Sequence, residues 1–210
     1  MWLYVFPVAP NPTKVRLYLA EKRAAGAALD VEERLVDLTK GEQRSAEHLR
    51  RNLRGSLPVL ALDDGSHLTE SLAIIEYLEE ICPDPSMLGT TPIARARIRE
   101  LERMADLGVL VAGARVVHAS RSPLGLPPSP EIAAQARQVL IDTLALLDRR
   151  LSDGRPFLAG ERVTIADCSL AAALQFARFG EVRDADDFEH VRRWDVAYRQ
   201  RPAATATLLL

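Results

Sequence analysis

The first part of the chain alternates short apolar runs with stretches of helical periodicity. Trp2 to Phe6 is an almost continuous run of apolar, aromatic and β-branched residues, typical of a central strand that is buried on both faces. Lys14 to Lys22 places its apolar residues at helical spacing, and Val31 to Leu38 alternates apolar with polar residues, as a second strand does. A strand, a helix and a strand in this order require a right-handed crossover and a parallel pair of strands. The chain is therefore predicted to open with a βαβ unit.

A proline-rich turn marks the start of the first helix. Asn11 followed by Pro12 is typical of an N-cap residue with proline at the first helical position. Asn11 is thus expected where the end of the first strand meets a helix N-terminus. After the second strand, Gln43 to Asn52 is predicted to form a short polar helix.

A proline opens the next strand. In the apolar run from Ser56 to Leu62, Pro58 cannot donate a hydrogen bond to a sheet, so it belongs at the first strand position. The turn at residues 63–65 and a second short run that ends at Thr69 complete a hairpin, and a helical pattern follows directly. A cis bond before Pro58 would turn the N–H and C=O of Leu57 outward.

Beyond residue 92 no strand pattern competes with helical periodicity. Residues 83–92 are rich in proline and form the one convincing linker, Ile93 to about Ser120 is predicted as one long helix, and Glu131 to Leu151 as another. Long helices in succession indicate a bundle. The prediction is a thioredoxin-like α/β domain over residues 1–82, a linker over 83–92 and an all-α helical bundle over 93–210.

The later helices carry one strong capping signal. Thr164, followed three residues later by Asp167, is a capping box in which each side chain closes an unpaired N–H group of the first helical turn. We assign this pair to folding and not to catalysis. The last helix is expected over Arg192 to Arg201, with the tail beyond Pro202 as a loose cover.

Composition narrows the classes of function. The 210 residues include 48% hydrophobic residues and carry a formal net charge of −2, which gives no long-range attraction to nucleic acid or to an anionic membrane. No apolar run approaches the ~20 residues that span a bilayer, and the apolar start is interpreted as a strand, not a signal peptide. The two cysteines, Cys82 and Cys168, lie far apart in the sequence, which favours a cytoplasmic location. Their separation argues against a metal site and against an internal dithiol. The histidines lack ligand spacing and are expected at the surface, outside catalysis; they are His48, His67, His118 and His190.

The segment around Pro58 resembles the glutathione-binding half of a cytosolic glutathione transferase. The resemblance rests on a proline at the start of a strand, followed by Glu70-Ser71 at the start of a helix. In that family, backbone groups before the proline pair with the cysteinyl part of glutathione, and the Glu-Ser pair holds its γ-glutamyl end. The resemblance therefore implies that Leu57, Pro58, Glu70 and Ser71 bind glutathione as co-substrate.

The usual thiolate-stabilising residue of that family is missing. A glutathione enzyme must present a thiolate at neutral pH, although a free thiol with a pKa of about 8.5 is only a few per cent ionised there. Family members supply a tyrosine, serine or cysteine for this task. Here Val5 takes the tyrosine position, with Tyr4 expected on the other side of the strand, and Ala9 or Pro10 takes the serine or cysteine position.

An asparagine is the replacement that the resemblance implies. The segment from Pro10 to Val15 resembles the Pro-Asn-Gly-x-Lys-Val segment of bacterial nu-class transferases, where the asparagine contacts the glutathione sulfur. Asn11 is therefore the predicted sulfur contact. Two alternatives stay open, namely that Asn11 is only an N-cap and that Thr13 is the donor.

Further residues are weaker candidates for substrate contacts. One cation near Pro58 would meet the glycine carboxylate of the tripeptide, although the same residues suit a solvated helix face; they are Arg50, Arg51 and Arg54, with Lys40 and Gln43 beside them. Ser56 stands where many relatives have a lysine. Side chains of the long helix would line an electrophile pocket or serve the bundle core; they are Met104, Leu107, Leu110, Val111 and Arg115.

The resemblance implies a glutathione transferase that presents the thiolate to a hydrophobic electrophile or a disulfide, without a metal. Electrostatic stabilisation by oriented donors would be its mechanism. The alternatives are a non-catalytic protein that uses this fold for binding or regulation, and a glutathione-dependent isomerase or dehalogenase. Family likeness also implies a homodimer through the third and fourth helices, with neither nucleic acid nor membrane as a partner.

Overall fold

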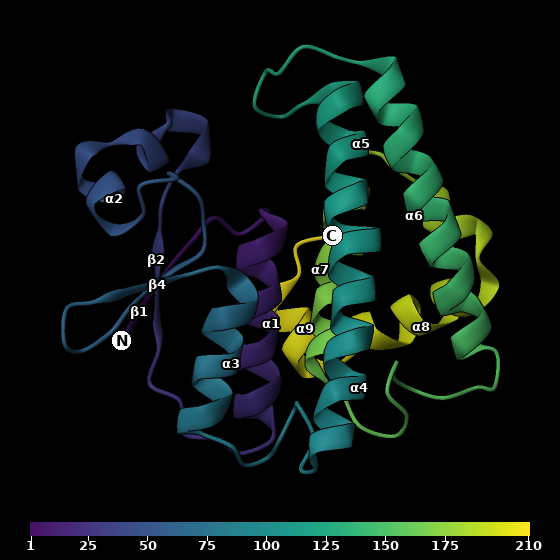
Figure 1. Cartoon of the computed structure of the whole chain (residues 1–210), viewed down its shortest axis with the longest axis horizontal. Helices are drawn as coiled ribbons and strands as arrows, with labels where there is room; N and C mark the ends of the chain where they lie inside the picture. Colours follow the sequence, from purple (N-terminus) through teal and green to yellow (C-terminus); the bar gives the residue numbers. More distant parts are fainter.

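The computed structural model describes all 210 residues and confirms an α/β half followed by a helical half (Figure 1). A mixed sheet of four strands has the order β2-β1-β3-β4. Its strands are β1 (Trp2–Val5), β2 (Glu32–Leu35), β3 (Val59–Ala61) and β4 (His67–Thr69). β1 runs parallel to β2 and antiparallel to β3, and β3 runs antiparallel to β4. The parallel pair is the predicted βαβ unit.

Helices lie on both sides of this sheet. On one side are α1 (Pro10–Ala24) and α3 (Ser71–Ile81), and on the other is the short α2 (Ala46–Arg51), which follows the 3₁₀ turns η1 (Leu38–Lys40) and η2 (Glu42–Arg44) (Figure 1). Alternation along β1 sends Leu3 and Val5 into the main core and Tyr4 into a smaller cluster on the other face. The expected orientation of Tyr4 is therefore confirmed.

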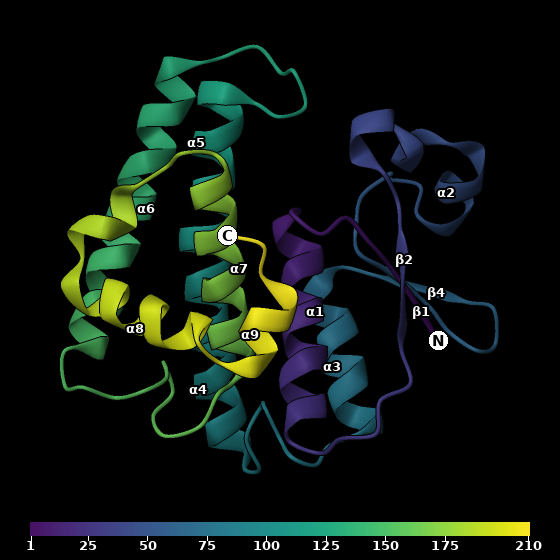
Figure 2. The ribbon, with the colours of Figure 1, turned by 180° about the vertical axis from the view of Figure 1, so that it is seen from behind.

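The helical half is built around two long antiparallel rods and a buried central helix. The first rod is continuous through α4 (Pro92–Arg103), the π-helical segment η3 (Met104–Val111) and α5 (Ala112–Arg121), and it packs beside α6 (Pro130–Leu151). Figure 2 shows α7 (Ile165–Phe179) between these rods and α1, with α8 (Glu189–Arg199) and α9 (Pro202–Thr207) closing the bundle after the 3₁₀ turn η4 (Asp184–Asp187). The single long helix expected over residues 93–120 is confirmed. No helix combines the length and the apolar character needed to cross a bilayer.

Local chemistry explains where the predicted boundaries were wrong. α1 begins at Pro10 with Ala9 as its N-cap, so Asn11 lies inside the first turn and is not the cap. The helix expected over residues 43–52 is interrupted at Ser45, whose hydroxyl accepts the N–H of His48 (3.2 Å) and starts α2.

The end of the chain was also predicted incorrectly. α8 starts at Glu189, earlier than expected, and the supposed loose tail contains α9. Ala203 and Ala204 of α9 are buried, since their small side chains allow the helix to pack closely against α1. This tail is therefore part of the core.

The predicted capping box is present at the start of α7. The backbone N–H and the hydroxyl of Thr164 donate to Asp167 Oδ2 (2.8 and 2.9 Å), and the N–H of Leu158 donates to Oδ1 (2.8 Å). Asp167 is fully buried, and burial raises the pKa of its carboxyl to about 6. The pair ties the preceding loop to the central helix, which agrees with a role in folding.

A buried ion cluster joins the two halves. Lys14 Nζ on α1 donates to Glu102 Oε1 (3.0 Å) and to Asp106 Oδ1 (2.5 Å), and Arg103 donates to Asp106 Oδ2 (2.7 Å). Ser169 of α7 donates its hydroxyl to Glu102 Oε1 (2.9 Å). Because buried charges need such partners, the cluster fixes how α1 lies against the helical half.

Candidate functional site

The segments predicted to bind the ligand converge at one end of the sheet. Val59 pairs with Tyr4 on one side and with Thr69 on the other. One step further along these antiparallel pairs, Pro58 therefore lies between Val5 and Glu70. The sheet register brings the proline strand, the end of β1 and the start of α3 to one place.

The backbone before Pro58 is free to bind a ligand. The Leu57–Pro58 peptide bond is cis. Neither the N–H nor the C=O of Leu57 is hydrogen-bonded within the chain. Both groups are therefore available as a donor and an acceptor for an extended peptide.

Asn11 reaches this place from the first turn of α1. Its Oδ1 accepts the hydroxyl of Ser71 (3.1 Å), which orients the amide and leaves its nitrogen without a partner in the chain. Pro10 and Pro12 have no N–H, so Asn11 carries the one free backbone donor at this helix start. Asn11 thus offers two N–H donor groups, the side-chain amide and the backbone N–H, at the positive end of a helix.

Thr13 is excluded as the alternative donor. Its side chain is fully buried, and its hydroxyl faces the carbonyl oxygens of Pro7 (3.0 Å) and Ala9 (2.9 Å). The hydroxyl oxygen also accepts the amide of Gln175 (3.3 Å). Thr13 therefore closes the turn before α1 and cannot reach a ligand.

The start of α3 presents unpaired backbone N–H donors. The first backbone hydrogen bond back along this helix runs from the Ile74 N–H to the Glu70 C=O (3.0 Å), so the N–H groups of Ser71, Leu72 and Ala73 are unpaired. Glu70 has a φ of 68°, a left-handed conformation that an L-residue rarely adopts. Thr69 does not cap the helix, because α3 has no side-chain cap.

The basic candidates near Pro58 have different partners. Arg54 is paired with Glu70 (3.0 Å). Arg51 contacts Glu47 and lies over the Tyr4 ring at 4.3 Å, so it is directed away from the site. Lys40 pairs with Asp37 at 3.4 Å.

The loop before Leu57 is fixed by side-chain contacts of Asn52 and His48. Asn52 Nδ2 donates to the C=O and the hydroxyl oxygen of Ser56 (3.0 and 2.9 Å), and His48 Nε2 lies 3.2 Å from the same C=O. His48 is buried, so its predicted surface position was wrong. A histidine in a polar helix gave no sequence signal for this packing.

An apolar cavity of about 290 Å³ opens against the first residues of α1. Residues of both halves form its wall; they are Phe6, Val8, Ala9, Pro10, Leu38, Thr39, His118, Pro123, Leu124, Phe176 and Phe179. Ala9 and Pro10 directly precede Asn11, so the cavity adjoins the two free donors. Its size and lining suit a small apolar molecule.

Of the two alternatives for the long helix, a place in the cavity wall is not observed, and a place in the bundle core is confirmed for Leu110. None of the five expected residues lines the cavity: Leu110 is in the core, while Leu107 and Val111 are exposed. The π-helical segment over residues 104–111 changes the helical period there and so shifts which side chains face inward. The wall comes instead from the end of α5 and the loop after it.

His118 is the one titratable side chain in the cavity wall. Its Nδ1 lies 3.0 Å from the hydroxyl of Ser122, and its ring packs against Phe176 at 5.8 Å between centroids. Partial burial lowers the pKa of this imidazole, so the ring is neutral at pH 7. No sequence signal indicated this position, since the residue meets α1 only through the tertiary fold.

Other reactive groups lie outside this cavity. Both cysteines are free, and burial raises the pKa of the Cys168 thiol well above its usual value. No group of three or more His, Cys, Asp or Glu side chains is placed to hold a metal ion. The arrangement therefore offers backbone groups, one amide and one imidazole around an apolar cavity.

The chain matches family models in both halves. Residues 9–81 match the glutathione S-transferase N-terminal domain, and residues 130–194 match the glutathione S-transferase C-terminal domain. Among characterised relatives, it is 31% identical to glutathione S-transferase 2 of Saccharomyces cerevisiae, over 99% of this chain and 89% of that protein.

Solved structures agree with these sequence matches. The crystal structure of Gtt2 from Saccharomyces cerevisiae aligns with a TM-score of 0.87 at 30% identity, over 99% of this chain and 100% of that one. A glutathione S-transferase domain-containing protein of Marinobacter aquaeolei aligns with a TM-score of 0.86 at 34% identity, over 97% of this chain and 100% of that one.

Proposed function

This chain belongs to the glutathione S-transferase family, and from that membership we propose that it binds glutathione along the backbone of Leu57 and presents the thiolate to a second substrate in the apolar cavity. The supporting observation is the convergence of unpaired donors. The free N–H and C=O of Leu57, the free N–H groups at the start of α3 and the amide of Asn11 surround one place. Pro58 directly precedes β3 there and shapes the edge on which the tripeptide lies.

The three parts of glutathione have distinct partners in this proposal. The cysteinyl backbone pairs with Leu57 as an added strand would. The γ-glutamyl carboxylate accepts N–H groups at the start of α3, including that of Ser71, and Glu70 meets the ammonium. The sulfur then lies toward Asn11, whose two N–H donors favour the thiolate over the thiol.

The cavity supports an uncharged, apolar electrophile as the second substrate. Its wall has three phenylalanines and no cationic side chain, so a dianionic substrate of an isomerase would lose its hydration without compensation. In conjugation, the thiolate forms a bond to the electrophilic carbon and the leaving group departs with the electron pair. In the disulfide reaction, the thiolate attacks one sulfur and the other sulfur leaves as a thiolate.

His118 provides a route for the thiol proton. A neutral imidazole in the wall of the same cavity accepts a proton, directly or through one water. Ser122 fixes the ring by its contact with Nδ1. We therefore assign the thiolate contact to Asn11 and the proton acceptor to His118.

Parallel assays test this function. A chloronitrobenzene and a small mixed disulfide are each supplied with glutathione to the purified chain. Turnover of the first supports conjugation, and turnover of the second supports disulfide reduction. The absent hydroxyl at the usual position is the one observation that favours a non-catalytic role, and that role predicts no turnover and no retention on immobilised glutathione.

Exposed apolar side chains support the proposed homodimer. Leu107 and Val111 of η3 and Val139 and Leu146 of α6 are all more than a third exposed. They flank the point where Gly108 packs directly on Thr143, since a Cβ at this glycine would lie 2.3 Å from the threonine oxygen. Together they form one apolar surface across two helices, which a second copy would cover.

Two free cysteines remain compatible with the cytoplasmic location that we propose.

A further inference from the structure

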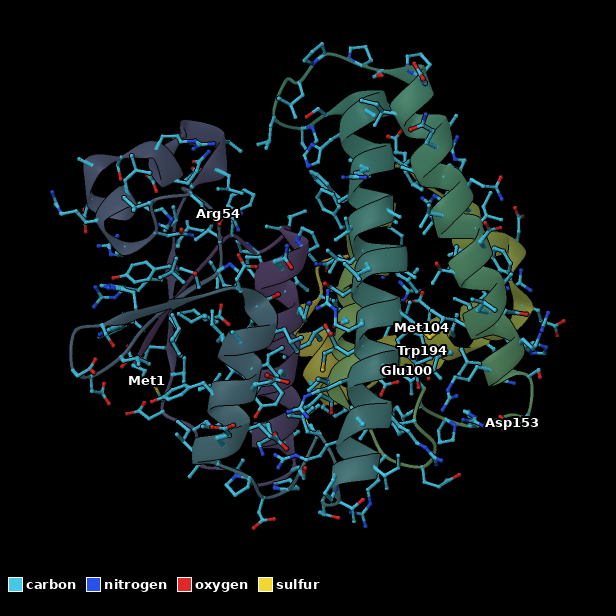
Figure 3. The ribbon with its side chains drawn as sticks, viewed as in Figure 1. Met1, Arg54, Glu100, Met104, Asp153 and Trp194 are labelled. Carbon is cyan, nitrogen blue, oxygen red and sulfur yellow. The ribbon has the colours of Figure 1, made fainter.

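An exposed ion pair borders the glutathione site. Arg54 donates from a terminal guanidinium nitrogen to Glu70 Oε1 (3.0 Å), and both side chains are largely exposed, at 78% and 67%. Figure 3 shows Arg54 between the α2 segment and the N-terminal ends of α1 and α3. The pair therefore lies where the γ-glutamyl end of glutathione is expected.

The backbone of Arg54 is fixed although its side chain is free. Its N–H donates to Asn52 Oδ1 (3.1 Å), and its C=O accepts a guanidinium N–H of Arg44 (3.3 Å). Asn52 is itself buried. The guanidinium can thus change partners by rotation of its side chain alone, without movement of the loop.

Glu70 is held in a similar way. Its C=O accepts the N–H of Ile74 (3.0 Å), and its left-handed φ of 68° places it directly before the free N–H groups of α3. A negative carboxylate and a group of anion-binding N–H donors therefore adjoin each other. Arg54 adds a positive charge at the same position.

We propose that Arg54 and Glu70 together recognise the zwitterionic α-amino-acid end of glutathione. Glu70 exchanges Arg54 for the α-ammonium, and Arg54 turns to the α-carboxylate, which it shares with the N–H of Ser71. The α-ammonium and the α-carboxylate of glutathione are attached to the same carbon, so they lie close together. Arg54 and Glu70 are also close together, so each can reach the ligand group of opposite charge. Arg54 is thus a specificity residue for the γ-glutamyl end and not, as the sequence suggested, for the glycine carboxylate.

Two physical features favour this exchange. An exposed ion pair is weak because water screens both charges, so the free protein loses little when the pair opens. The α-amino-acid end of glutathione and the Arg54–Glu70 pair each carry one positive and one negative charge. After the exchange of partners, every one of these charges therefore faces an opposite charge. An arginine also matches a carboxylate through two parallel N–H donors, which gives directional selectivity.

The first test is calorimetric titration of glutathione into wild type, Arg54→Gln and Arg50→Gln. Arg50 is an exposed arginine on the neighbouring α2 without an ion-pair partner, so it is the matched control for loss of one charge. Arg54→Gln is expected to weaken binding roughly 3- to 10-fold, in the range of a partly exposed charged hydrogen bond. Arg50→Gln is expected to bind as wild type does, and equal effects of the two variants would overturn the proposal.

The second test identifies which carboxylate Arg54 meets. One analogue carries an amide at the γ-glutamyl α-carboxylate, and another carries an amide at the glycine carboxylate. The difference between wild type and Arg54→Gln should vanish for the first analogue and persist for the second. The reverse pattern would assign Arg54 to the glycine end and contradict the proposal.

This inference rests on the proposed function, and the titrations separate the two. Wild type that gives no heat with glutathione contradicts the proposed function itself. Wild type that binds glutathione, together with an Arg54→Gln effect that is the same for every analogue, leaves the proposed function intact and refutes the role of Arg54.

Discussion

At the scale of single residues, Asn11 combines two features that thiolate chemistry requires. Its amide is oriented by Ser71, and its free donors lie at the start of a helix beside the cavity. A neutral amide cannot remove a proton, so the role that we propose for Asn11 is to stabilise the charged sulfur once the proton has left. In the proposed function, thiolate stabilisation and proton removal are therefore separate tasks with separate residues.

The first prediction concerns Asn11→Ala. Loss of a hydrogen bond to a charged sulfur, worth ~1.5–3 kcal/mol, should lower kcat/KM about 10- to 100-fold and raise the pKa of the bound thiol by about one to two units. The kinetics with a chloronitrobenzene and the thiolate absorbance against pH measure both effects. An unchanged thermal unfolding curve is the control, and equal activity of the two proteins would remove Asn11 from its role.

The second prediction concerns His118→Gln. Because burial lowers the pKa of this histidine, the wild-type imidazole becomes protonated at a lower pH than an ordinary histidine does. The kcat/KM of wild type should therefore decline only at a more acidic pH than an ordinary histidine would cause, while the variant starts at least about tenfold lower and lacks this decline. A variant with the wild-type profile would contradict the assignment.

The sequence predicted where the candidate residues with a local signal lie, but not where distant packing places the others. Glu70, Ser71 and Asn11 each lie beside a proline or a helix start that the chain itself displays, so their positions could be predicted. His118 lies more than a hundred residues after Asn11 and reaches the cavity through the packing of the two halves. No residue near His118 in the sequence indicates that its side chain lines the cavity.

At the scale of elements, the π-helical segment shows a similar limit. An i to i+5 turn has no strong composition signal, yet it shifts every later residue around the helix axis. The long helix itself was predictable from its periodicity, but the face that lines the cavity was not. The start of α7 was predictable in full, because Thr164 and Asp167 are both local and both polar in an apolar sequence.

The third prediction concerns the pH dependence of this helix start. Burial raises the pKa of Asp167 to about 6, above its unfolded value near 4, so folding binds a proton between these two values. The contribution of Asp167 to the free energy of unfolding is therefore full below about pH 4 and declines as pH rises to about 6. Asp167→Asn should lose most stability near pH 4.5 and less at pH 7.

Denaturant unfolding of both proteins across this pH range measures the difference. Thr164→Ser keeps the hydroxyl and serves as the control, with a small and pH-independent change. A deficit of Asp167→Asn that grows with pH would mean that the hydrogen bonds to the carboxylate outweigh its burial.

At the scale of the whole molecule, the site exists only because the two halves meet. The sheet supplies the edge for the tripeptide, and α5, α7 and the loop after α5 supply half of the cavity wall. The buried cluster of Lys14 with Glu102 and Asp106 sets the position of α1 against the rod one turn beyond Asn11. The domain boundaries at residues 82 and 93 stay predictions.

The fourth prediction concerns the proposed dimer. Leu107→Asp places a charge in the apolar surface formed with Val139 and Leu146, and a desolvated charge in such an interface is strongly unfavourable. Wild type should sediment at twice the chain mass of 23.2 kDa and the variant at the chain mass. Leu53→Asp, at a residue that is 89% exposed on the other half, is the control and should sediment as wild type does. A monomeric wild type would contradict the proposed dimer.

Calorimetric titration of glutathione into wild type, Leu57→Ala and Leu57→Pro shows whether the backbone of Leu57 binds the tripeptide. Leu57→Ala keeps the backbone N–H and removes the side chain, whereas Leu57→Pro removes the N–H that is proposed to bind the cysteinyl part. With both variants checked for an intact melting transition, we expect wild type and Leu57→Ala to bind alike and Leu57→Pro to bind about tenfold more weakly, or worse. Absence of heat with wild type, or equal binding by all three proteins, would contradict the account.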